Sequence, residues 1–246
     1  MTTQNWRALA SGLTSALGTD VPPIAITFHD NPASVPAGVA RFDDPMPAPH
    51  EVDGRTGRVS AGCVFWMKSI NRSFATVEED HANCSVGSMT HGFKTLQDVG
   101  GNADVAALLE SGWVTMDVVP QIPVVTKKPA VVTYGPLADA QVEPDVVLCR
   151  ITARQLMVMM DAFPGLCIEG KPQCHIIAIA KQLGEIAASA GCQLSRVRTG
   201  MPNSELTLAI PAAKLAATVA QIQATAECDG AVARYASEDM RRFGNN

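Results

Sequence analysis

The sequence predicts one mixed domain of the α/β or α+β class, with helices packed on a mixed sheet, spanning residues 1–246. Apolar residues make up 47% of the chain and charged residues 17%, which is enough for a sizeable core. Strand-like apolar runs alternate with segments of helical period, but no repeat is apparent. No clear linker divides the chain, so we expect a single domain.

The first half opens with an amphipathic helix expected at residues 5–17, with Asn5 as its N-cap and Gly18 at its end. A strand entered through prolines follows at 21–28. Residues 30–58 are proline-rich and predict a loop with room for a short strand at 39–42. Three further elements are expected: an extended piece at 75–77, a helix at 103–111, and a proline-broken apolar segment at 118–125.

The stretch 62–93 contains the candidate site residues of this half. Cys63 opens a helix on which Trp66, Ile70 and Phe74 recur at helical spacing. His81 and then Cys84 follow, the latter in a loop of small residues. A thiol at a helix start is favoured as a thiolate by the free amide donors there.

The second half is more regular. Apolar runs predict strands at 130–134, 145–151 and 205–210. Helical periods predict helices at 153–163 and 212–224, and the tail after Cys228 is a charged helix or frayed. Residues 164–172 read as a loop containing Cys167, and another helix starts at Cys174.

Composition narrows the function classes. The net charge of −5 and the lack of basic runs argue against a nucleic-acid partner. No apolar run approaches the roughly 20 residues of a membrane span, and the N-terminus lacks a signal-peptide pattern, so we expect a cytoplasmic protein. Seven cysteines in a reducing compartment argue against a disulfide framework. Metal binding, catalysis and burial remain for these thiols, and homo-oligomerisation stays open.

Two pairs of cysteines, Cys63 with Cys84 and Cys174 with Cys192, follow the same predicted path. In each pair a helix leads away from the first cysteine, and an extended segment returns to the second. A continuous helix from Cys174 would carry Cys192 roughly 27 Å away at 1.5 Å per residue. Gly184 instead has the position of a glycine that ends a helix. Residues 185–191 would then return extended over about 20 Å, bringing Cys192 back to Cys174.

Together the four cysteines suggest one metal or cluster site. No C-x₂-C knuckle is present, so a structural zinc site is not indicated, nor is the cysteine run of bacterial ferredoxins. Cys149 falls within a predicted strand and is expected in the core.

Several motifs accompany the cysteines in a fixed order. They are PPIAI at 22–26, PDVVL at 144–148, RQLM at 154–157, GCQLSRVRTG at 191–200 and ELTLAIP at 205–211. With Cys63, Cys84, Cys174 and Cys192, this order resembles the bacterial and archaeal family catalogued as domain of unknown function 169, over most of the chain. The chain departs from the family pattern at Asn83-Cys84-Ser85, where Cys-Pro-Gly is common, and at residues 193–196, where a glycine often precedes the arginine. The resemblance implies a cysteine-bound metal centre of iron–sulfur type without a settled activity.

The leading hypothesis is an iron–sulfur enzyme with a [4Fe–4S] cluster, acting on a small anionic molecule. An iron left open by three thiolates is a soft Lewis acid, so desulfuration is the most concrete reaction, with dehydration related to it. His81 is the candidate acid or base. Arg196 and Arg198 are the candidate substrate-binding residues; both would share a face of an extended segment, and Arg198 is preferred because Thr199-Gly200 leaves open backbone beside it.

Two other classes stay open. The first is a non-enzymatic electron carrier or redox sensor with all four cysteines bound to a closed cluster. The second is a cluster-free enzyme in which a thiol is the nucleophile, paired with His81 or His91.

Overall fold

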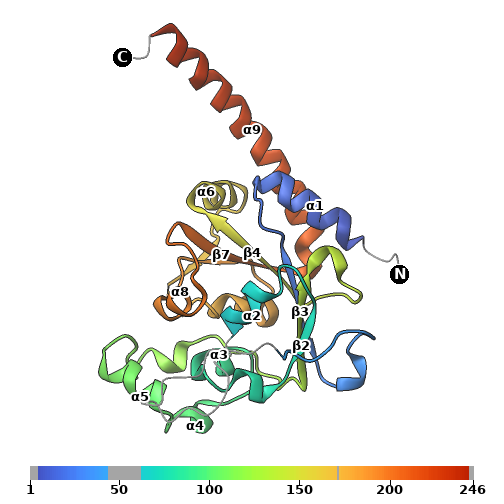
Figure 1. Cartoon of the computed structure of the whole chain (residues 1–246). Coiled ribbons are helices and arrows are strands. Elements are labelled where there is room, and N and C mark those ends of the chain that lie inside the picture. The colour runs from blue at the N-terminus through green and yellow to red at the C-terminus, as the bar shows by residue number, and fades with distance from the viewer. Residues whose placement is uncertain (1–4, 44–61, 171, 244–246) are drawn as a thin grey trace.

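A twisted seven-stranded sheet forms the centre of the molecule, as shown by a computed structural model that describes residues 5–43, 62–170 and 172–243 (Figure 1). The strand order is β2-β3-β1-β4-β7-β6-β5, and the only parallel neighbours within this described sheet are β5 and β6. The strands are β1 (Ile24–His29), β2 (Phe74–Thr76), β3 (Val131–Pro136), β4 (Val146–Thr152), β5 (Cys167–Glu169), β6 (Ala187–Ser189) and β7 (Glu205–Pro211). The two edge strands, β2 and β5, are short, so they offer few unpaired backbone groups to another chain.

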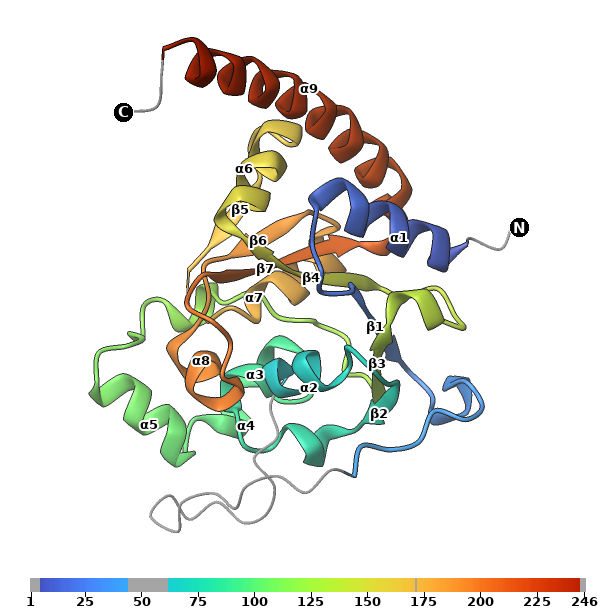
Figure 2. The same ribbon diagram turned by 45° about the horizontal axis from the view of Figure 1, so that its top comes forward.

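Helices cover both faces of this sheet, so the molecule is a single α/β domain (Figure 2). The helices are α1 (Trp6–Leu17), α2 (Gly62–Lys68), α3 (Ser85–Thr90), α4 (Leu96–Val99), α5 (Ala103–Glu110), α6 (Ala153–Ala162), α7 (His175–Ala178), α8 (Gln193–Thr199) and α9 (Leu215–Arg242). Among the described residues, none of these helices combines the length and hydrophobicity needed to cross a bilayer.

The alternation of side chains along β4 builds two separate cores. Val146 and Leu148 point to one face, where they join side chains from α2, α3 and α7. Val147, Cys149 and Ile151 point to the other, where α1, α6 and α9 pack. Cys149 is therefore a core residue, as predicted. The candidate site lies on the first of these faces.

Several predicted elements are confirmed with small shifts. Asn5 caps α1 by accepting the amide of Ala8 at 3.0 Å, and Gly18 ends the helix in the left-handed conformation. Residues 44–58 of the expected loop lie outside the described residues; before them, Arg41 forms only an isolated bridge with Ala75. The helix that contains Cys63 ends at Lys68, before Phe74, which begins β2.

The segment after Cys174 follows the predicted path. The short helix α7 continues as a π-helical turn, Ile179–Leu183, and Gly184 ends it with φ 66°. The chain then returns as β6. The segment 185–191 is thus not helical, and Cys192 comes back to the start of α7.

Candidate metal centre

Each of the four paired cysteines lies at the start of a short helix. Cys63 is in the first turn of α2, while Cys84, Cys174 and Cys192 are the N-cap residues of α3, α7 and α8. All four line one pocket, here called the cysteine pocket. Its other walls include Gly87, Gln173, Ser195 and Arg198. The structure thus brings together the four cysteines that the sequence pairs, and their binding of a metal stays a prediction.

Helix starts give these sulfur atoms nearby amide donors. The amide of Gly87 donates to Cys84 Sγ at 3.4 Å, and the amides of Leu194 and Ser195 donate to the sulfur of Cys192. Such donors stabilise negative charge on sulfur. A Cβ on Gly87 would lie 3.4 Å from Cys84 Sγ, so a larger residue there would narrow the pocket.

Burial has the largest effect on the protonation of three of these thiols. It raises the pKa of Cys63 to about 12; the neighbouring Cys84 adds to the rise, and a hydrogen bond with Ser195 opposes it. Burial also raises the pKa of Cys174 well above its ordinary value and raises that of Cys192. These groups are therefore protonated near neutral pH unless a cation binds them, because a coordinated thiol loses its proton.

Arg198 brings a positive charge to this pocket. Its guanidinium hydrogen-bonds Cys84 and also interacts with Cys63 and Asp104. Burial lowers the pKa of Arg198, but the interactions with Cys84, Cys63 and Asp104 outweigh burial and leave that pKa above its usual value. Asp104 in turn accepts the amide and hydroxyl of Ser85 at 2.9 and 2.7 Å, which anchors the start of α3 next to Cys84.

The two arginines do not share a face, which corrects the prediction from the sequence. Residues 193–199 form α8 rather than an extended segment, and Gly200 ends it with φ 67°. Residues two apart in a helix point to opposite sides, about 200° apart. Arg198 therefore faces the cysteine pocket. Arg196 instead donates to the backbone carbonyls of Ala190 and Glu205, each at 2.9 Å, so it is a structural residue.

His81 is not brought to the cysteine pocket. It is fully buried, with Nε2 3.0 Å from Thr76 Oγ1 and its ring 4.6 Å from that of Phe93. Burial lowers its pKa well below the ordinary value, with His91 as a second cause. A neutral histidine in an aromatic core is a packing residue, so the structure gives no support to His81 as the acid or base.

Gln173 and Ser195 are site residues that sequence reasoning missed. Gln173 Nε2 donates to Ser195 Oγ at 2.6 Å, and Ser195 is hydrogen-bonded to Cys63. The available signal was their position: Gln173 precedes Cys174, and Ser195 lies one helical turn after Cys192. Polar residues beside ligand cysteines often orient them.

A single metal ion does not fit the side chains seen here. Within residues 5–43, 62–170 and 172–243, no three His, Cys, Asp or Glu side chains are arranged to hold one ion. A cluster makes a different demand, because its thiolates bind different irons and so lie farther apart. Four free thiols around one pocket meet that demand in number and in chemical softness.

Comparison with known proteins agrees with the motifs. No curated protein and no solved structure gives a significant match to the chain. A family model, DUF169, described as "Uncharacterised ArCR", matches residues 12–221. That range contains all four pocket cysteines and Arg198. The chain therefore belongs to the DUF169 family.

Proposed function

We propose that this protein is an iron–sulfur-dependent enzyme that acts on a small anionic molecule. The observation that carries the proposal is the meeting of four free thiols from four helix starts in one pocket that also contains the half-buried Arg198. Cys63, Cys84, Cys174 and Cys192 would hold the group, with at least three of them as ligands, and we expect a [4Fe–4S] cluster. When bound, the group would supply a soft Lewis acid with affinity for sulfur.

Desulfuration is the reaction we favour. A thiocarbonyl compound and water would give the carbonyl compound and hydrogen sulfide: the C=S bond is replaced by C=O, both protons of water leave with the sulfur, and no net oxidation occurs. Arg198 would hold an anionic group of the substrate and offset negative charge on the pocket sulfurs. Ser195 would keep Cys63 oriented, and the buried walls would exclude bulk water.

One observation favours a second candidate, an electron carrier or redox sensor. All four sulfurs reach the same pocket, as a closed four-cysteine cluster requires. The cluster-free thiol enzyme is disfavoured, because a nucleophile needs a depressed pKa and burial raises the pKa of Cys63 and Cys174. We place either activity in the cytoplasm, where seven free cysteines remain reduced.

Anaerobic purification followed by iron and sulfide analysis tests the proposal. We expect about four irons and four sulfides per chain, as a [4Fe–4S] group contains. Serine variants of the pocket cysteines should lose most of this iron, whereas Cys228→Ser, at an exposed position on α9, should keep it. Retention in one pocket variant would indicate an open iron, and loss in all four a closed cluster. If the purified protein contained no iron, and the four serine variants did not differ from it in iron content, both the enzyme and the electron-carrier proposals would be refuted.

A further inference from the structure

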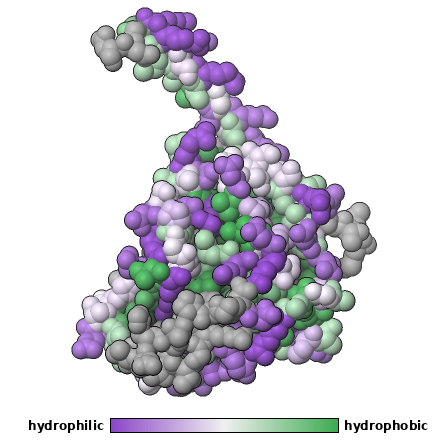
Figure 3. All heavy atoms as spheres, in the orientation of Figure 1, coloured by the Kyte–Doolittle hydropathy of each residue, from purple (hydrophilic) through white to green (hydrophobic). Residues whose placement is uncertain are grey.

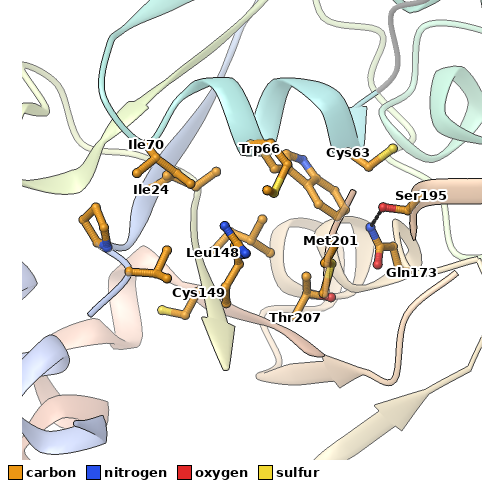
Figure 4. Close-up of a pocket in the computed structure, with 14 residues that line it drawn as sticks. Ile24, Cys63, Trp66, Ile70, Leu148, Cys149, Gln173, Ser195, Met201 and Thr207 are labelled. Atoms are coloured by element: carbon orange, nitrogen blue, oxygen red, sulfur yellow. Dashed lines mark hydrogen bonds between the residues drawn. The ribbon is translucent and has the colours of Figure 1, made fainter. Parts of the chain in front are cut away.

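Three of the four sulfurs in the cysteine pocket have uncharged polar partners. The hydroxyl of Ser195 is hydrogen-bonded to Cys63, and the two residues lie next to each other in Figure 4. The hydroxyl of Thr90 is hydrogen-bonded to Cys174. Backbone amides are the partners of Cys192. Uncharged partners of this kind orient a thiolate and leave it able to bind a metal.

Cys84 differs because one of its partners carries a full positive charge. The guanidinium of Arg198 hydrogen-bonds its sulfur, and Arg198 is the only cationic side chain among the described residues that line the pocket. The amide of Gly87 donates to the same sulfur at 3.4 Å, and this bond caps α3. Two donors therefore meet at the Cys84 sulfur.

The pairing of Cys84 with Arg198 is held in place from the start of α5. The carboxylate of Asp104 attracts Arg198 and accepts the amide and the hydroxyl of Ser85, the residue after Cys84. Asn102, the N-cap residue of α5, makes no side-chain bond to its own helix and instead donates to Ser85 Oγ at 2.9 Å. These contacts fix both partners, so the pair is a designed part of the pocket wall.

A metal gains least at a sulfur that already has a cation beside it. A guanidinium repels a metal cation, and its hydrogen bond engages the electrons that a ligand sulfur would share with the metal. The uncharged partners of Cys63, Cys174 and Cys192 impose no such repulsion. Of the four sulfurs, that of Cys84 is therefore the weakest candidate for a ligand.

We propose that Cys63, Cys174 and Cys192 bind the iron–sulfur group and that Cys84 does not, so that one iron is left open on the side of Arg198. This inference rests on the function proposed above and deepens it, because it names the corner of the site at which a substrate reacts. The anionic group of a substrate would bind Arg198 in place of the Cys84 sulfur. Cys84 would have two other roles, which are to cap α3 and to hold Arg198 in the pocket.

The iron content of the serine variants, purified anaerobically as full-length chains, tests this assignment. Cys84→Ser should be the exception among them and keep about as much iron as the parent chain, because serine is also a favourable N-cap residue and preserves the start of α3. Cys63→Ser, Cys174→Ser and Cys192→Ser should each lose most of their iron. Loss of iron from a folded Cys84→Ser chain would overturn the inference.

Cyanide, a small anion that binds open iron, tests the same assignment on the parent chain. Added cyanide should change the EPR spectrum of the reduced cluster, because a closed cluster offers it no free position. Arg198→Met should weaken this binding about ten- to a hundredfold, the loss expected for one charged hydrogen bond. The matched control is Arg196→Met, the same substitution on the opposite side of α8, which should leave cyanide binding unchanged.

An EPR spectrum that cyanide leaves unchanged would overturn the inference even if Cys84→Ser did not fold. Equal effects of the two methionine variants would overturn the place of Arg198 beside the open iron.

Failure of this inference and failure of the proposed function give different results. If the parent chain holds iron and all four serine variants lose it, or if a variant other than Cys84→Ser keeps it, this inference is refuted and the cluster stands. If the parent chain is free of iron, or if all four variants keep their iron, the proposed function is itself refuted.

Discussion

At the scale of single residues, the fully buried His91 links the protonation of one side chain to the folded state. His91 Nδ1 lies 2.8 Å from the carbonyl oxygen of Gly87, which can only accept, so Nδ1 carries a proton. Burial lowers the pKa of His91 to about 4, although the bond to Gly87 partly opposes this. His91 thereby braces the turn of α3 that begins at Cys84.

We expect the protein to lose stability as the pH falls from 7 to 5. The unfolded chain protonates its histidines near pH 6.5, whereas folded His91 stays neutral until about pH 4, so the unfolded state binds more protons in this window. His91 alone should lower the free energy of unfolding by about 2 kcal/mol between pH 7 and pH 5. Urea unfolding at both pH values measures it. His91→Gln should show a correspondingly smaller pH effect; an unchanged difference would contradict the assignment.

At the scale of elements, α8 gives two neighbouring arginines opposite roles. Its N-terminal end presents Cys192 to the cysteine pocket, and its two sides carry Arg198 and Arg196. Arg196 ties the helix to backbone carbonyls on either side of it, at Ala190, Pro202 and Glu205. It therefore holds the turn at Gly191, whose φ of 106° needs a glycine.

Methionine substitutions should separate these roles. Arg196→Met should lower the free energy of unfolding by about 1 to 3 kcal/mol, because three carbonyls lose a charged donor. Arg198→Met should instead raise the KM for an anionic substrate about ten- to a hundredfold, with iron retained, as expected for loss of a charged hydrogen bond. Chemical denaturation and steady-state kinetics of both variants provide the test. If Arg196→Met alone changed the KM, the assignment would be reversed.

At the scale of the whole molecule, α9 is partly core and partly projection. Leu215, Val219 and Ile222 pack in the core, but the later turns leave the body (Figure 1). Figure 3 shows mainly hydrophilic residues along this projection. Val232 and Tyr235 are exceptions, with 66% and 64% of their surface exposed.

Removal of residues 232–246 should therefore leave the body intact. Since the buried positions of α9 end at Ile222, we expect the melting temperature to change by less than about 2 °C, as for surface changes generally. Differential scanning calorimetry of the shortened chain and of the full-length chain measures this change in melting temperature. A drop of many degrees would show that the projection has a structural role in the intact protein, for example through self-association, which stays a prediction.

The sequence by itself determined the mixed α/β class, the regular elements and the cysteine pairs. The sequence pattern predicted the longer elements because their burial is regular along their length. The helices α1 and α6 bury one face and show a helical period, whereas β4 is buried on both faces and shows a continuous apolar run. Gly184 was readable as a helix end because glycine readily adopts the left-handed conformation in which many helices end.

Only the tertiary structure decided the short elements and the walls of the site. Helices α3 and α8 span under two turns, too short to form alone, so contacts such as that of Asp104 with Ser85 fix them. Whether Arg196 and Arg198 face the same side depended on residues 193–199 forming the helix α8. The walls of the cysteine pocket could not be read from sequence either, because Gly87, Pro172 and Leu194 come from distant segments, and no local pattern records which side chains a fold brings into one cavity.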